Sequence, residues 1–128
     1  MPHRSFLTRS FIIAALAALV TSCGGGAATG DVDKIAIVQS TFDITLTNNS
    51  GRALFQVRSE IEPTGPASHF SNTIARMENG EKRVIAHNLF TDRDGIPFSP
   101  RNVRVSRIIV TAKDIDGKDL RVEMPWQK

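Results

Sequence analysis

Apolar and polar residues alternate along most of this chain, and turn-forming clusters break the alternation at short intervals. The clearest case is residues 42–47, where Phe42, Ile44 and Leu46 alternate with polar residues. Because successive side chains of a strand point to opposite faces, this pattern predicts a half-buried β-strand. No segment after the first 22 residues has the convincing spacing of an amphipathic helix. The chain is therefore expected to fold as an all-β protein.

The alternation predicts about seven strands. They are expected at residues 35–38, 42–47, 53–61, 70–77, 82–90, 103–112 and 120–124. The segments between them are rich in glycine, proline, asparagine and aspartate, the residues that turns require. One of these, Asn79-Gly80, is the strongest short signal for a β-hairpin and predicts that its two flanking strands pair.

Two strands contain irregularities. Phe55 is predicted on the inner face of its strand, and Leu54 breaks the alternation there at a bulge or a second packing surface. In the strand over residues 103–112 the inward-facing positions change from odd-numbered to even-numbered residues. This change predicts a bulge or a bend near Ser106 and Arg107.

Regularly spaced strands of this number predict a single antiparallel β-sandwich over residues 34–128. The run from Ile44 through Asn48-Asn49-Ser50-Gly51 to Val57, with the later turn at residues 78–81, resembles immunoglobulin-like and fibronectin-like modules of bacterial envelope proteins. This resemblance implies an immunoglobulin-like fold for most of the chain. The chain has one cysteine and no tyrosine, so it lacks the paired cysteines and the tyrosine corner of antibody domains.

The N-terminal segment has the features of an export signal. Arg4 and Arg9 precede an unbroken apolar run over residues 11–20, which is shorter than the roughly 20 residues that a membrane-spanning helix needs. The run leads into Val20-Thr21-Ser22-Cys23, which resembles the lipobox of bacterial lipoproteins. The resemblance implies that a helical signal peptide, residues 1–22, is cleaved between Ser22 and Cys23, and that Cys23 carries a diacylglycerol and usually an N-acyl chain.

The lipidated cysteine would be followed by a short tether. Residues 23–33 begin with Cys23 and three glycines, and are expected to form a flexible linker between the membrane and the folded domain. In bacteria with two membranes, an aspartate directly after the lipidated cysteine resembles an inner-membrane retention signal. Because Gly24 occupies that position, we expect the outer membrane, with the domain facing the periplasm.

The rest of the sequence offers little catalytic chemistry. The net charge of +3 falls to about +1 when the signal peptide is removed, which gives little support to nucleic-acid binding. His69 and His87 have no second histidine or cysteine at ligand spacing, so neither a zinc site nor a cofactor site is predicted. No motif for a catalytic nucleophile is present, and we predict that the protein is not an enzyme.

Two further features leave alternatives open. Closely spaced carboxylates in Asp92–Gly95 and Asp114–Asp119 fit Asp-Gly turns between strands, or a weak calcium site shared by both loops; the spacing of an EF-hand is absent. Phe90 precedes a proline-containing loop at residues 91–100, and Phe98 lies within it. They fit a contact surface or, as the favoured alternative, Phe98 lies under the loop as a satellite of the core.

These observations predict a non-enzymatic, lipid-anchored envelope protein. Its β-sandwich would bind another envelope protein or support an assembly, and tethering would raise its effective concentration at the membrane. The alternative is a lipoprotein that binds a small ligand or a metal ion through the loops after Phe90 and Asp114. A protein partner predicts an exposed apolar patch or an open strand edge, whereas a small ligand predicts a concave pocket.

Overall fold

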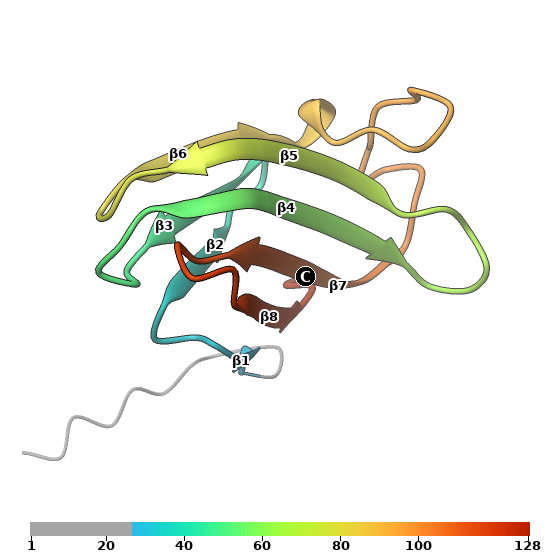
Figure 1. The fold of residues 1–128 in the computed structure, drawn as a ribbon. Helices are drawn as coiled ribbons and strands as arrows, with labels where there is room; N and C mark the ends of the chain where they lie inside the picture. The colour runs from blue at the N-terminus through green and yellow to red at the C-terminus, as the bar shows by residue number, and fades with distance from the viewer. Residues whose placement is uncertain (1–26) are drawn as a thin grey trace, which may run out of the picture.

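The computed structural model describes residues 27–128, so the predicted signal peptide, Ser22 and Cys23 lie outside the described residues. Strands account for nearly all of the regular structure, together with one short 3-10 helix, η1 (Figure 1). The elements are β1 (Thr29–Gly30), β2 (Ile35–Gln39), β3 (Asp43–Asn48), β4 (Leu54–Pro63), β5 (Phe70–Met77), β6 (Lys82–Ala86), η1 (His87–Leu89), β7 (Val105–Lys113) and β8 (Asp119–Pro125).

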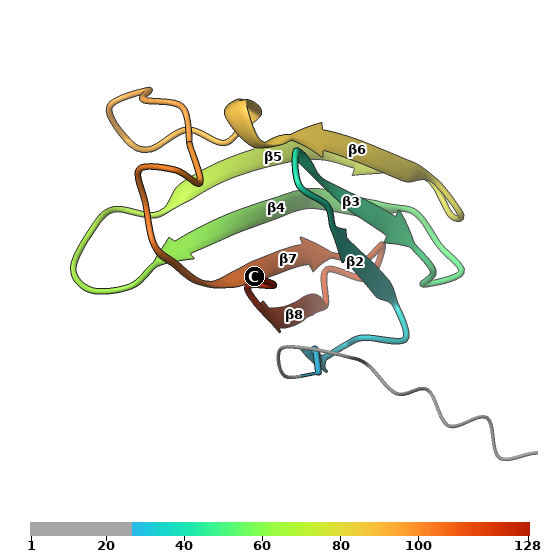
Figure 2. The same ribbon diagram turned by 180° about the vertical axis from the view of Figure 1, so that it is seen from behind.

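The strands form two antiparallel sheets that face each other. The larger sheet has five strands in the order β1-β8-β7-β4-β5, and the smaller has three in the order β2-β3-β6. Seen from behind, the small sheet lies across the large one (Figure 2). The prediction of an all-β chain with two packed sheets is confirmed. No helix among residues 27–128 has the length and hydrophobicity to cross a membrane.

The core lies between the sheets, where the alternating apolar residues meet. Ile44 and Leu46 of β3 are completely buried, as their alternation predicted, whereas Phe42, which precedes β3, is 78% exposed and does not join them. The large sheet contributes a matching row from its central strands, including Ile61, Ile108 and Val110, each of them also fully buried. Because burying an aliphatic side chain stabilises a fold by about 1.5–3 kcal/mol, this row is a main source of stability.

Both predicted irregularities are β-bulges. The register between β4 and β7 shifts between Phe55 and Arg58, and Gln56 has a positive φ of 49°. The extra residue reverses the parity of β4, so Leu54 points into the core at 1% exposure and Phe55 lies on the outer face. The prediction that Phe55 faces inward was therefore wrong. A second shift, beside Ser106, confirms the bulge expected there.

The connection at Asn79-Gly80 is a turn, but β5 and β6 are not paired with each other. They belong to different sheets, so the predicted hairpin was wrong. Gly80 has the positive φ of 78° that the turn chemistry anticipates. The strand predicted over residues 82–90 is also shorter than expected, since β6 ends at Ala86 and η1 comes next.

Asn48 is the buried polar residue that explains this turn. Its backbone N–H donates to the carbonyl of Glu81, and its own carbonyl accepts from the N–H of Gly80 at 2.8 Å. Its side-chain amide donates to the carbonyls of Arg52, Met77 and Glu78 at 2.7–3.1 Å. The turn therefore pairs with the end of β3, and this contact replaces a ladder between β5 and β6.

We predict that Asn48→Ala destabilises the protein by about 2–4 kcal/mol, because it removes the donor of the buried carbonyl of Met77 and of the partly buried carbonyls of Arg52 and Glu78. The matched control is Asn49→Ala, since Asn49 is exposed and its side chain forms no hydrogen bond among the described residues; its effect should stay within about 0.5 kcal/mol. Urea unfolding of both variants measures the difference. A loss below about 1 kcal/mol for Asn48→Ala would show that the buried amide is dispensable.

Candidate functional site

One side of the sandwich has two strand edges without neighbours. β5 is the last strand of the large sheet, and β6 is the last strand of the small sheet on the same side, joined to it by the turn at residues 78–81. We call this the open side, defined by β5 and β6. Unpaired strand edges present backbone donors and acceptors that another chain can use.

A short β-bridge between Ser71 and Thr91 shows in which direction the backbone groups of β5 point. The N–H of Ser71 donates to the carbonyl of Thr91 at 2.9 Å, and its carbonyl accepts from the N–H of Thr91 at 3.1 Å, so both backbone groups of Ser71 point away from β4. Alternate residues of an antiparallel strand repeat this direction. Thr73 and Ala75 therefore direct their N–H and C=O groups to the same edge, where no described strand pairs with them.

A shallow groove of about 530 Å³ runs along this edge between β5 and β6. Residues 72–76 form one wall, and Val84 and Ile85 contribute to the other. Leu89 of η1 is 56% exposed at one end, where its carbonyl accepts a 3.2 Å hydrogen bond from the amide of Asn72. The groove thus combines unpaired backbone with exposed apolar side chains.

The opposite side of the sandwich is partly covered. β1 pairs with β8, and Gly30 approaches so closely that a Cβ atom there would lie 2.2 Å from the carbonyl oxygen of Arg121. At the edge of the small sheet, Gln39 and Gln127 exchange two hydrogen bonds at 2.8 and 2.9 Å. β1 lies within the predicted tether over residues 23–33, whose last part is therefore held against the large sheet.

The outer face of the small sheet is nearly uncharged at its centre. Val38, Thr45 and Val84 face one another across its three strands, and both valines are 61% exposed. This row reaches the open side through Val84. It provides an exposed apolar surface beside the unpaired edge.

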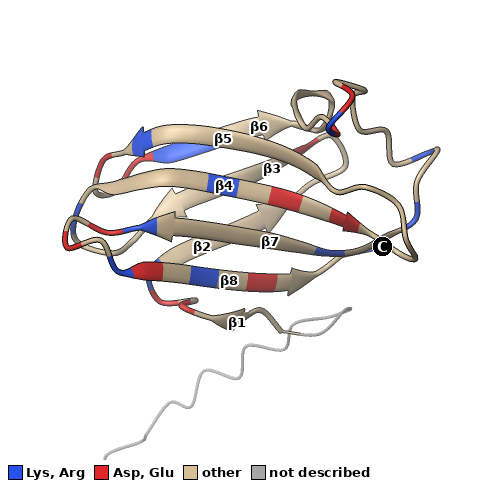
Figure 3. Cartoon of the chain, turned by 45° about the vertical axis from the view of Figure 1, so that its right-hand side comes forward, with Lys and Arg blue, Asp and Glu red and all other residues tan. Residues whose placement is uncertain are grey.

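The outer face of the large sheet is charged instead (Figure 3). Arg107 hydrogen-bonds to Glu62 and, at 2.9 Å, to Glu123. The pKa of Glu62 is lowered mainly by its hydrogen bond from Arg107, and the pKa of Glu123 mainly by its hydrogen bond from Arg121. These charged side chains pair with one another, so this face has fewer unpaired groups for a partner than the open side.

The two aspartate loops form the same turn. Asp92 accepts hydrogen bonds from the N–H groups of Asp94 and Ile96, and Asp114 accepts from residues 116 and 118, all at 2.9 Å. The loops also lie at opposite ends of the large sheet, so a calcium site shared between them is excluded. Among residues 27–128, no three His, Cys, Asp or Glu side chains are close enough to hold a metal ion.

Phe90 and Phe98 are at most 2% exposed and belong to the core. Their burial leaves these two rings almost no exposed surface, and Phe98 packs in the same core cluster as Phe90. His69 lies exposed beside Glu60, whereas His87 is only 7% exposed. Burial of the imidazole lowers the pKa of His87 from its ordinary 6.5, although the charge of Asp43 opposes this.

Because the unfolded chain protonates His87 more readily than the folded protein does, stability should be lost as the pH falls through 6.5. We predict a lower free energy of unfolding at about pH 5.5 than at about pH 7.5. His87→Gln should flatten this dependence, and His69→Gln should preserve it. Glu62, Glu81 and Glu123 have pKa values lowered from 4.5 and do not titrate in this range. An unchanged slope in His87→Gln would contradict the assignment.

Sequence reasoning missed the open side. Thr73, Ala75 and Val84 were placed in two paired strands, because an Asn-Gly turn gives the same local signal whether its flanking strands pair or separate into two sheets. The buried position of Asn48 at the end of β3 decides between these outcomes, and its surroundings are set only by the tertiary fold. No known protein family matches the chain, and no curated protein is similar to it in sequence.

Proposed function

We propose that this chain is a lipid-anchored envelope protein whose immunoglobulin-like β-sandwich binds an extended segment of another envelope protein. The segment adds as a strand to the free edge of β5. Cys23, exposed by cleavage after Ser22, carries the lipid, and the domain faces the periplasm from the outer membrane. The protein acts by binding, and no catalytic step is part of the proposal.

The observation that carries this proposal is the open side. Extended peptides bind exposed sheet edges through backbone hydrogen bonds, while neighbouring pockets select their side chains. Thr73 and Ala75 provide the backbone groups, and the groove of about 530 Å³ provides contacts with Val84 and Leu89. The apolar contacts and the unpaired backbone therefore lie side by side, as strand addition requires.

The position of the anchor agrees with this use. Cys23 is four residues before Ala27, the first described residue, and this length of chain spans at most about 14 Å. The chain enters at β1, on the opposite edge of the large sheet from β5. Four strand spacings of about 4.8 Å separate these edges, which directs the open side away from the attachment point. A weak binder held in this way gains effective concentration at the membrane surface.

The anchor is tested by Cys23→Ser in the full chain, expressed in a bacterium with two membranes. We expect the variant to remain uncleaved by lipoprotein signal peptidase, to incorporate no labelled palmitate and to lose the outer-membrane location. Gly24→Ala is the matched control, and Gly24→Asp should retain the lipidated protein at the inner membrane. Palmitate labelling of Cys23→Ser at the wild-type level would refute the anchor.

The open side is tested with a photo-crosslinking amino acid placed at residue 84 or 38 of the anchored protein in its own membranes. Both positions hold a valine that is 61% exposed, in one row of the small sheet, but only residue 84 lies at the groove. We expect one discrete adduct from position 84 and none from position 38. The added Thr73→Lys change should reduce the adduct at least about fivefold, because charge on a strand edge opposes pairing.

Mass spectrometry of the adduct identifies the occupant. A peptide of a different envelope protein supports the proposal, whereas a second copy of this chain would replace it with self-association. Equal adducts from positions 84 and 38 would show that the contact does not depend on the open side, and so would an adduct unaffected by Thr73→Lys.

A further inference from the structure

The end of the sandwich formed by residues 40–43, η1 and residues 97–101 carries a second feature, independent of the open side. His87 is 7% exposed, and its Nε2 atom has no hydrogen-bond partner among the described residues. No other buried side-chain nitrogen or oxygen of residues 27–128 lacks a partner. Buried polar groups are normally satisfied, so this exception requires an explanation.

Aromatic rings fix the position of the imidazole. The centroid of His87 lies 5.7 Å from both Phe98 and Trp126, and those two rings are themselves 5.7 Å apart in an edge-to-face arrangement. Phe70 extends the cluster at 5.3 Å from Phe98. These contacts hold one polar group among aromatic rings, and small-molecule sites combine apolar rings with a few polar groups in this way.

Two hollows share His87 and Pro100 in their linings. The larger has a volume of about 800 Å³, and Phe42, Phe98 and Arg101 are part of its wall. The smaller has a volume of about 450 Å³ and extends past Trp126. The larger is within the range of sites that hold small organic molecules. Phe42 is 78% exposed at its rim, where its ring is available to cover a ligand.

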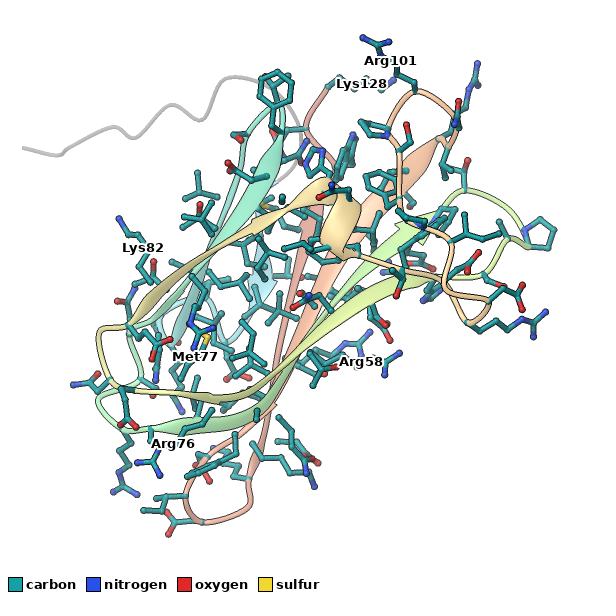
Figure 4. All side chains as sticks on the ribbon, turned by 90° about the horizontal axis from the view of Figure 1, so that it is seen from above. Arg58, Arg76, Met77, Lys82, Arg101 and Lys128 are labelled. Carbon is teal, nitrogen blue, oxygen red and sulfur yellow. The ribbon has the colours of Figure 1, made fainter. Side chains whose placement is uncertain are left out.

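The charge of this end favours an anion. Neither hollow is lined by an aspartate or glutamate, whereas Arg101 lines the larger and Lys128 the smaller. Both cations lie at this end of the molecule (Figure 4), and neither forms an ion pair with a described residue. Asp43 is the nearby carboxylate whose charge acts on His87, and it accepts a 2.7 Å hydrogen bond from Ser40.

We propose that the larger hollow binds a small organic anion that carries an apolar ring system. The ring packs between Phe42 and the apolar wall at Pro97 and Phe98. Its acidic group pairs with the guanidinium of Arg101, and an oxygen of that group accepts a hydrogen bond from Nε2 of His87 when the imidazole carries a proton on both nitrogens, because the other nitrogen donates to the backbone of Asp43. This site is separate from the strand-binding groove, so either proposal can be refuted without affecting the other.

The test uses 8-anilinonaphthalene-1-sulfonate, an aromatic anion, as the probe. Trp126 is the only tryptophan of the chain, so energy transfer from it to the dye localises binding to this end. The comparison compound is N-phenyl-1-naphthylamine, which has the same ring system without the sulfonate. We expect saturable transfer with the sulfonate and at least about tenfold weaker binding of the neutral compound, as for the loss of a charged contact. Equal affinities would overturn the assignment of an anion.

Matched variants locate the contacts. Arg101→Gln should weaken sulfonate binding about tenfold, whereas Arg104→Gln, which removes an equally exposed arginine outside both hollows, should leave it unchanged. Phe42→Ser should also weaken binding, and because Phe42 is exposed this change should not affect folding. In ¹⁵N spectra of the imidazoles, the probe should shift the Nε2 signal of His87 and not the signals of His69. Equal losses in the two arginine variants, or an unmoved His87 signal, would overturn the proposal.

Discussion

The sandwich depends on one buried amide. The chain passes from the small sheet to the large one after Asn48, and it returns through residues 78–81. Both crossings are held by Asn48, through side-chain hydrogen bonds to Arg52, Met77 and Glu78 and backbone hydrogen bonds to the returning turn. Because Asn48 bonds to both of these connections, neither can move without breaking its hydrogen bonds at this end of the sandwich.

This arrangement also determines which strand edges remain free. Because the turn at residues 78–81 pairs with the end of β3, β5 and β6 separate into different sheets and cannot complete each other's hydrogen bonds. The open side is therefore a consequence of the connection that stabilises the fold.

The sequence predicted seven of the eight strands, their approximate limits and the all-β class, because period-two alternation is a local property that burial enforces; it missed β1, which lies in the predicted tether. It located the bulges near Leu54 and Ser106 for the same reason, since an extra residue reverses the parity of the residues beyond it. It could not assign Phe55 to a face, because the direction of the reversal depends on where the bulge residue lies. The separation of β5 from β6 and the environment of His87 arise from contacts between residues distant in sequence, which no local pattern encodes.

Exposed sheet edges promote aggregation, and proteins usually protect them. Here β1 pairs with residues 122 and 123 of β8, and the side chain of Gln39 holds the end of β2 to the backbone of Gln127 through two hydrogen bonds. On β5, Arg76 stacks over Phe55 at 5.3 Å and places a charge at the far end, while the bridge between Ser71 and Thr91 closes the near end. On β5 only residues 72–75 between them stay unpaired among the described residues. This stretch is long enough to accept a few residues of one partner strand, which limits strand addition at β5 to a short segment.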